Sequence, residues 1–447
     1  MMRGLRQIIL ALALAAASLS PVLAQDRDPQ AIVQAMADNL IAGDFEAAGA
    51  DFSTEMLQAL PPDTLRATWE GLVEQVGAFQ AIAGAPQVTQ AEGMAIVVVT
   101  MQFETALLDM QVAVSADGQI TGLYFRPSQA MERTQEVPAD LPDYVDLQAF
   151  EEREVVLNAG TDWELPGTLA LPVKRGRFPA VVLVHGSGAN DRDETIGPNK
   201  PFRDLAWGLA SQGIAVLRYD KRTRVHASQM AGLRDMTVED EVIHDAVAAV
   251  ELLRNTDEVD PDRVFVVGHS LGGYLAPRIA AEAGHVAGVV ILAGHVRPLQ
   301  DLIVAQTEYL LGLDGELSDE DRAQLEQIEQ IKGAIDHLDA AAPGMYFGAP
   351  PAYWVDLRKY DPVKAARALD KPLLILQGER DYQVTMDDFM RWQEGLMGQD
   401  DVTFIRYASL NHLLMSGEGP GSPAEYEQPG YVDADVIADI AGWIFEH

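Results

Sequence analysis

Cysteine is absent from this chain of 447 residues. Its absence excludes disulfide bonds, a cysteine nucleophile, thiolate-bound metal sites and a lipid-modified N-terminal cysteine. The sequence also lacks a His-Glu-x-x-His motif, a phosphate-binding glycine loop and a dinucleotide-binding fingerprint. We therefore expect a fold that is stabilised by its hydrophobic core without disulfide bonds. We also expect a reaction that requires no metal and no organic cofactor.

Basic residues are scarce. The chain has 32 Lys and Arg against 68 Asp and Glu, a formal net charge of −36. Such a protein is repelled by nucleic-acid phosphates and by anionic lipid surfaces, so we expect no nucleic-acid partner. Because no run of five or more acidic residues occurs, the charge indicates a solvated acidic surface rather than an acidic tail.

Long hydrophobic runs are also missing, since a membrane span needs about 20 apolar residues. The N-terminus instead has Arg3 and Arg6 ahead of a short apolar stretch that ends near Ala24. This pattern predicts a secretory signal peptide over residues 1–24, and a retained membrane anchor is the alternative. Cleavage would change the formal charge from −36 to −38. We expect an exported protein, periplasmic or extracellular, with no stable membrane insertion after cleavage.

Hydrophobic residues make up 48% of the chain, which allows two domains. Residues 25–126 show helical spacing first, with Asp63 placed to cap a helix, and then three strand-like runs, "MAIVVVTMQFE", "LLDMQVAVSADG" and "ITGLYFRP". Helices followed by a meander predict a small α+β domain. This order resembles the nuclear-transport-factor-like or cystatin-like domains that precede some secreted hydrolases. No catalytic cluster stands out here, so we expect a packing, substrate-gating or attachment role.

Residues 127–147 are rich in proline and charge and are predicted to be a linker. From residue 148 to 447, continuous apolar strands alternate with helices. This alternation predicts an α/β fold with a mostly parallel sheet covered on both faces. A helical interruption at about 295–370 follows one strand and precedes the next, which places it at the carboxyl edge of the sheet. We interpret it as a cap that sets the acyl and alcohol preference.

Ser270 lies in "FVVGHSLGGYLA", where a buried strand meets a helix through Gly-x-Ser-x-Gly. This motif is the nucleophile elbow, in which the glycines make room for a sharp turn and a strained serine. The alternative is a turn that glycines merely punctuate. Serine needs a base within hydrogen-bond reach, and the order along the chain is serine, acid, histidine.

His412 alone among the later histidines follows the final strand, in the loop that leads to the last helix, and is the predicted base. The others precede or follow earlier strands, lie in the cap or end the chain: His285, His295, His337 and His447. Asp381, after the penultimate strand, is the predicted acid, which would fix the histidine tautomer. Glu379 remains its competitor, and Asp387 is expected to face solvent from a helix.

Two backbone N–H groups are predicted to bind the oxyanion. One belongs to Leu271, directly after the nucleophile, and the other to Ser187, in the loop "HGSGAND" after an earlier strand. His185 is expected to hold that loop rather than carry a proton. The run "NDRDET" is expected to order its own loop through an internal Asp-Arg ion network, and "YDKRT" to do similar structural work at the end of the next strand. A paired-carboxylate role for the first run, and contact with an acidic substrate group for the second, stay open.

With all four elements in order, the region from about Phe150 to His447 resembles the α/β-hydrolase superfamily. The run from His185 to Thr223 is similar to secreted bacterial esterases of the dienelactone-hydrolase-like and prolyl-oligopeptidase-like branch. The resemblance implies a serine hydrolase that cleaves small-molecule carboxylic esters through an acyl-enzyme, with Ser270, Asp381 and His412 as the triad. Peptidase, amidase, thioesterase and lactonase activities use the same triad, and a non-catalytic binding protein is the alternative outside enzymes.

Overall fold

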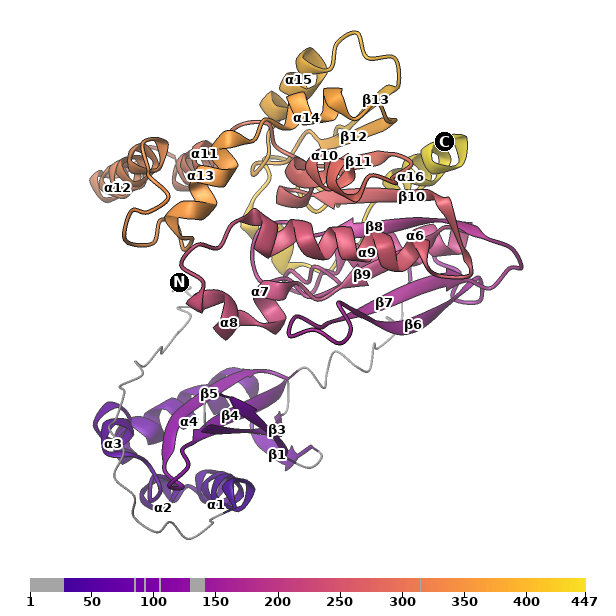
Figure 1. Cartoon of the computed structure of the whole chain (residues 1–447). Coiled ribbons are helices and arrows are strands. Elements are labelled where there is room, and N and C mark those ends of the chain that lie inside the picture. Colours follow the sequence, from indigo (N-terminus) through magenta and orange to yellow (C-terminus); the bar gives the residue numbers. More distant parts are fainter. Residues whose placement is uncertain (1–27, 84–85, 92–93, 104–105, 129–140, 314) are drawn as a thin grey trace. The chain divides into compact units, whose positions relative to one another are not determined.

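The computed structural model describes residues 28–447, except 84–85, 92–93, 104–105, 129–140 and 314. The chain divides into two compact units, residues 1–139 and 140–447, and each is described by itself (Figure 1). The predicted signal peptide and the middle of the predicted linker lie outside the described residues.

The N-terminal unit packs helices on an antiparallel sheet. The β3 strand lies between β4 on one side and both β1 and β2 on the other, and β5 pairs with β4. Its helices are α1 (Pro29–Ala42), α2 (Phe45–Ala48), α3 (Thr54–Ala59) and α4 (Pro62–Val76). Its strands are β1 (Phe79–Ile82), β2 (Gln87–Ala91), β3 (Met94–Phe103), β4 (Leu107–Val114) and β5 (Ile120–Pro127).

Alternation along β3 explains how this sheet covers its core. Val97, Val99 and Met101 are fully buried, while the residues between them are only partly buried. The three predicted strands are present, but β1 and β2 were not predicted, because they are short and mix polar with apolar residues. The prediction that Asp63 caps a helix is wrong, because Pro61 is the N-cap of α4 and Asp63 lies inside its first turn. There its charge complements the helix dipole.

The second unit is built on one sheet of eight strands in the order β13-β12-β11-β10-β8-β9-β7-β6. All neighbours from β13 to β9 are parallel, whereas β7 pairs antiparallel with both β9 and β6. The strands are β6 (Phe150–Leu157), β7 (Leu165–Pro172), β8 (Phe178–Val184), β9 (Ala215–Tyr219), β10 (Val259–His269), β11 (Val289–Leu292), β12 (Leu373–Gly378) and β13 (Val402–Tyr407).

Helices cover both faces of this sheet, as the continuous apolar strands predicted. In β8, Val182 and Val184 pack into one core, and Val181 and Leu183 pack into the other. The first core includes residues of α9 (His244–Arg254), α10 (Leu271–Ala283), α13 (Pro351–Lys359), α14 (Pro362–Ala368) and α15 (Met386–Gly395). The second includes residues of α6 (Pro201–Gln212) and α16 (Ala434–Glu446). The fold is therefore a doubly wound α/β sheet.

The stretch predicted to be a cap contains α11 (Leu299–Gly312), α12 (Asp319–Asp336), α13 and α14. Figure 1 shows α11, α12 and α13 gathered together, in orange. The remaining short elements are α7 (Arg222–Val225), α8 (Ala227–Gly232), the π-helical η1 (Glu239–Ile243), which leads into α9, and the 3-10 helix η2 (Pro423–Glu427). Within the described residues, no helix is both long and apolar enough to cross a membrane.

Residues 141–147, the last part of the predicted linker, pack against the second unit. The Tyr144 hydroxyl donates to the Val432 carbonyl at 2.9 Å, and the Asp146 N–H donates to Ser211 Oγ at 2.9 Å. Leu141 and Tyr144 also pack against the core beneath α6 and α16. The C-terminal end of the predicted linker therefore packs against this unit. The sequence did not indicate this packing, because the stretch is rich in proline.

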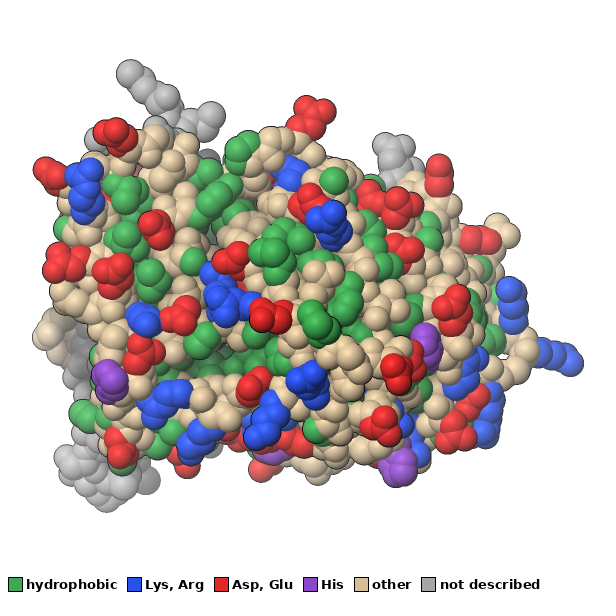
Figure 2. Space-filling model, turned by 90° about the horizontal axis from the view of Figure 1, so that it is seen from above, with side chains coloured by type: hydrophobic (Ala, Val, Ile, Leu, Met, Phe, Trp, Pro, Cys, Tyr) green, Lys and Arg blue, Asp and Glu red, His purple; other side chains and the backbone are tan. Residues whose placement is uncertain are grey.

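The acidic residues are dispersed over the surface rather than gathered in one block. On the face shown in Figure 2, red carboxylate side chains alternate with blue cations and green hydrophobic side chains. This distribution agrees with the solvated acidic surface that the composition indicated.

Candidate active site

Ser270 sits on a strained turn between β10 and α10. Its backbone has φ 54° and ψ −115°, a conformation that residues other than glycine rarely adopt. A Cβ on Gly268 would overlap the Gly272 carbonyl, and a Cβ on Gly272 would overlap the Val184 carbonyl. The two glycines therefore let β8, β10 and α10 approach closely enough to hold this turn, as the elbow motif predicted.

His412 and Asp381 come together across two loops. His412 Nδ1 lies 2.7 Å from Asp381 Oδ2, and both side chains are buried. The second oxygen of Asp381 accepts the N–H groups of Gln383 at 2.8 Å and Val384 at 2.9 Å. A carboxylate on Nδ1 fixes the tautomer that leaves Nε2 free to accept a proton.

The competing carboxylates lie elsewhere. Glu379 faces Arg406 at 3.4 Å, with 36% of its side chain exposed. Asp387 is exposed on α15, as expected. Of the three carboxylates that the sequence left open near β12, the structure brings only Asp381 to His412.

The predicted oxyanion donors flank Ser270. Leu271 is the first residue of α10, where N–H groups have no partner within the helix. Ser187 lies in the loop after β8 and lines the same cavity as Ser270. That loop passes very near Ser270, since a Cβ on Gly186 would lie 3.1 Å from the Cβ of Ser270.

A buried ion pair that the sequence did not predict ties these loops together. His269 Nδ1 lies 2.8 Å from Glu194 Oε2, and His269 Nε2 lies 2.9 Å from the carbonyl oxygen of His412. The other oxygen of Glu194 accepts the Gly186 N–H at 2.6 Å. Because both ring nitrogens face acceptors, His269 donates on both sides. This one pair thus connects the loop that carries Ser187, the turn that carries Ser270 and the loop that carries His412.

The pKa values of this pair favour its charged form. Burial is the largest single effect and disfavours the charge on each partner, but the partner's opposite charge and the hydrogen bonds together outweigh it. The pKa of His269 is therefore raised and the pKa of Glu194 is lowered. The sequence offered one clue, because Glu194 belongs to the run "NDRDET" that was expected to make ion pairs.

The other charged residues of "NDRDET" and "YDKRT", except Asp191, also form ion pairs, with partners in other segments. Asp191 instead accepts a hydrogen bond from the Thr195 N–H at 2.8 Å. The ion pairs join the loops after β8 and β9 to each other and to neighbouring elements. The pairs are Arg192–Asp220 at 3.0 Å, Arg218–Asp193 at 2.9 Å, Lys221–Glu241 at 2.6 Å and Arg222–Asp245 at 2.5 Å.

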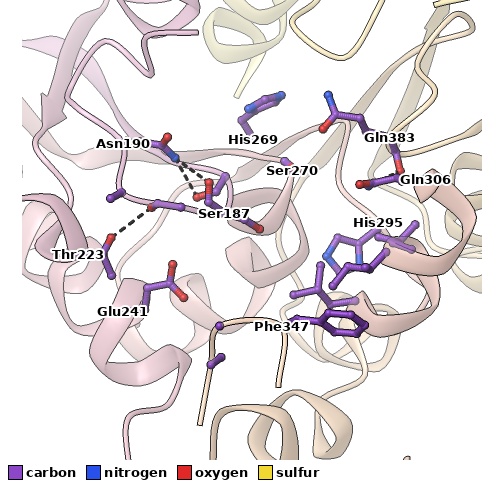
Figure 3. A pocket seen from close by; sticks show the side chains of 18 of the residues that line it. Ser187, Asn190, Thr223, Glu241, His269, Ser270, His295, Gln306, Phe347 and Gln383 are labelled. Carbon is purple, nitrogen blue, oxygen red and sulfur yellow. Dashed lines mark hydrogen bonds between the residues drawn. The ribbon is translucent and has the colours of Figure 1, made fainter. Parts of the chain in front are cut away.

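Ser270 and His412 open into one cavity of about 460 Å³ (Figure 3). One part of its lining is apolar and comes largely from the predicted cap: Leu299, Leu302, Ile303, Phe347, Tyr353 and Trp354. Polar side chains line the rest, among them Asn190, Thr223, Glu241, His295, Gln306 and Gln383. Sequence reasoning missed this polar lining, because its members come from segments far apart in the chain.

The remaining histidines take other positions. His185 is buried at the start of the loop that carries Ser187, its ring centroid 4.9 Å from that of Phe202, and burial lowers its pKa. His285 is exposed at the end of α10, and His337 ends α12. His447 contacts Trp443 and Asp401 at the end of the chain. His295 lines the cavity without a carboxylate on its ring.

A doubly wound parallel sheet with a serine elbow between strand and helix defines a hydrolase with an α/β fold. The alpha/beta hydrolase family model matches residues 181–426. Esterase EstD from Thermotoga maritima is 40% identical over 408 residues, covering 91% of this chain and 93% of that protein. The chain belongs to the alpha/beta hydrolase family and is an enzyme of that family, which confirms the predicted resemblance.

The N-terminal unit matches a second family model, described as a protein of unknown function (DUF3887), over residues 33–123. Among solved structures, the Pyrococcus furiosus esterase Pf2001 is similar at 16% identity with a TM-score of 0.42, covering 67% of this chain and 92% of that chain. Est1E from Butyrivibrio proteoclasticus is similar at 16% identity with a TM-score of 0.42, covering 66% of this chain and 99% of that chain.

Proposed function

We propose that this enzyme hydrolyses carboxylic esters through an acyl-enzyme on Ser270. One observation carries the proposal: Ser270, in its strained turn, shares a cavity with His412, whose Nδ1 is held by Asp381 at 2.7 Å. The name of the Thermotoga maritima relative, an esterase, supports the same reaction.

In the first half-reaction, Ser270 Oγ attacks the ester carbonyl while His412 Nε2 takes the hydroxyl proton. The tetrahedral oxyanion accepts hydrogen bonds from the backbone N–H groups of Leu271 and Ser187. His412 then returns the proton to the alkoxide oxygen as the C–O bond breaks, so that the alcohol leaves. In the second, His412 takes a proton from water, whose oxygen attacks the acyl carbon. Breaking the acyl bond to Ser270 returns the proton to Oγ and releases the carboxylic acid.

Replacing Ser270 by alanine tests this assignment. We expect Ser270→Ala to lower kcat on short p-nitrophenyl esters by about 10⁵–10⁶-fold with an unchanged melting temperature, because it removes the nucleophile and little volume. Ser228→Ala, at an exposed position on α8, is the matched control and should keep wild-type turnover. Wild-type turnover by Ser270→Ala would overturn the assignment.

A fluorophosphonate probe separates an enzyme from a binding protein of the same fold. It should label Ser270 in the wild type and leave Ser270→Ala unlabelled. Absence of label from an intact wild-type protein would favour a non-catalytic protein. Matched p-nitrophenyl esters, anilides and thioesters of one acyl group then decide whether esters are preferred over the amides and thioesters that the same triad can cleave.

We also propose that the protein is exported after removal of residues 1–24. The basic start, the short apolar stretch and Ala24 in the sequence support this proposal. Mass spectrometry of protein recovered from the periplasm and the medium should find a chain that begins at Gln25. A full-length chain confined to the cytoplasm or the membrane would contradict export.

A further inference from the structure

The His295 ring presents a hydrogen-bond acceptor that no described residue uses. Its Nδ1 lies 2.7 Å from the Arg297 carbonyl oxygen. A carbonyl oxygen only accepts, so Nδ1 carries the proton of the neutral ring and Nε2 keeps its lone pair. Nε2 makes no hydrogen bond within the described part of the chain, and it is buried, so a ligand reaches it only when the side chains around it move.

The His295 ring is neutral at neutral pH. Burial lowers the pKa of His295 to about 4, so the ring is uncharged in neutral solution. A buried acceptor without a partner costs free energy, and native proteins keep few of them. An acceptor left open beside a reactive serine therefore points to a ligand that completes it.

Several contacts hold His295 in place. The ring stacks on Tyr274 with centroids 4.1 Å apart and planes 7° apart. Asp388 Oδ1 accepts the N–H groups of Val296 and Arg297, each at 2.9 Å, and Trp392 Nε1 donates to the Gly294 carbonyl at 2.8 Å. The backbone on both sides of His295 is thus fixed, so the acceptor is preorganised.

His295 lines the cavity that holds Ser270 and His412. In Figure 3 its ring lies between Gln306 and Phe347, on the side of the cavity opposite Thr223 and Glu241. His295 is poorly suited to be the catalytic base, because its Nδ1 meets a backbone carbonyl where His412 meets a carboxylate.

The charge of the cavity indicates which donor fits. Its two lining carboxylates are already paired, Glu194 with His269 at 2.8 Å and Glu241 with Lys221 at 2.6 Å. An ammonium group would find no free negative charge there, whereas a neutral hydroxyl needs only an acceptor. We propose that His295 Nε2 accepts a hydrogen bond from a hydroxyl of the substrate, and that the enzyme selects hydroxylated esters. This inference rests on the proposed ester hydrolysis.

Pairs of esters that differ by one hydroxyl test the inference. The panel is methyl hexanoate against methyl 3-hydroxyhexanoate and methyl 6-hydroxyhexanoate, and propyl acetate against 3-hydroxypropyl acetate, followed by pH-stat titration. We expect kcat/KM of at least one hydroxylated ester to exceed that of its partner about tenfold, the effect of one neutral hydrogen bond. In His295→Phe, which keeps a ring but no acceptor, this ratio should fall to about one.

Two further variants keep the test decisive. His285→Phe makes the same change at an exposed position and should leave the ratio unchanged. If His295→Phe does not fold, His295→Asn retains a donor toward the Arg297 carbonyl and places no acceptor at Nε2. Equal turnover of every pair by the wild type, or a ratio that survives in a folded His295 variant, overturns the inference and leaves ester hydrolysis standing. A wild type that hydrolyses none of the esters overturns both.

Discussion

Asp381 accepts four hydrogen bonds from groups of the protein itself. Gln383, Val384 and Gln377 donate to it in addition to His412, and its side chain is fully buried. These donors fix the carboxylate, which in turn fixes the imidazole. In the proposed mechanism, the histidine therefore acts as a base without first being oriented.

Replacing Asp381 by asparagine removes the charge and changes the hydrogen bond to His412 Nδ1. We expect Asp381→Asn to lower kcat about 10³–10⁴-fold with little change in KM, because the wrong tautomer of His412 is favoured. Glu379→Gln, two residues away and exposed, should stay within about twofold of the wild type. Steady-state kinetics on one p-nitrophenyl ester compares them, and a larger loss in Glu379→Gln would reassign the acid.

The pair formed by Glu194 and His269 predicts a pH window of stability. The pKa of Glu194 is lowered, so its contribution is present above its ordinary pKa of 4.5 and is lost as pH falls through the lowered value. The pKa of His269 is raised, so its contribution is present below its ordinary pKa of 6.5 and is lost as pH rises through the raised value. Both contributions are complete between these two ordinary values.

The measurement is the melting temperature of the wild type minus that of the double variant Glu194→Gln, His269→Gln. We expect the difference to be largest between about pH 4.5 and 6.5 and to shrink by a few degrees on either side. The pair Arg322 and Asp319, exposed on α12, provides the control, and its removal should shift melting little at any pH. A difference that does not change with pH would show that the Glu194 pair is uncharged.

Single positions could be predicted where a local motif dictates them. Ser270 and the loop of Ser187 were predicted from glycines beside buried strands. His412 was predicted from its place after the last strand. Asp381 was the predicted acid, but Glu379 stayed its competitor, because only three-dimensional contact tells which carboxylate reaches the histidine. Glu194 and His295 escaped prediction for the same reason, since their partners lie in distant segments.

At the scale of elements, glycines at close approaches differ from those on open helix surfaces. Gly268→Ala should destabilise the enzyme by about 3 kcal/mol or more, because its Cβ would overlap the backbone of Gly272. Gly442→Ala, on the exposed face of α16 with nothing within 4 Å of its Cβ, should stabilise it by about 0.5–1 kcal/mol. Denaturant melts measure both. Equal effects would mean that the elbow relaxes to accept a side chain.

Elements were predictable when their hydrophobic period was long and unambiguous. Buried strands such as β8 and β10 were recognised, and so were the helices that follow them. The strands β1 and β2 were not, because they are short and mix polar with apolar residues, whereas the equally short β11 is continuously apolar. The π-helical turn η1 cannot be told from an α-helix in the sequence, because its side chains keep an amphipathic spacing that does not distinguish the two backbones.

At the scale of the whole molecule, the net charge of −36 predicts a dependence on salt. With 68 acidic residues against 32 basic ones, most carboxylates have no cation to neutralise them, and they repel one another in the folded state. Raising NaCl from about 0.01 M to 1 M shortens the Debye length from about 30 Å to 3 Å and screens this repulsion. We expect the melting temperature at pH 7.5 to rise by several degrees over that range.

The same titration near the isoelectric point is the control. At a pH close to the sequence pI of about 4.4 the net charge vanishes, so screening has little repulsion to remove. NaCl should then leave the melting temperature nearly unchanged, or lower it slightly by weakening ion pairs such as that of Arg192 and Asp220. An equal rise at both pH values would assign the effect to general salting-out, since that mechanism acts on apolar surface and does not depend on net charge.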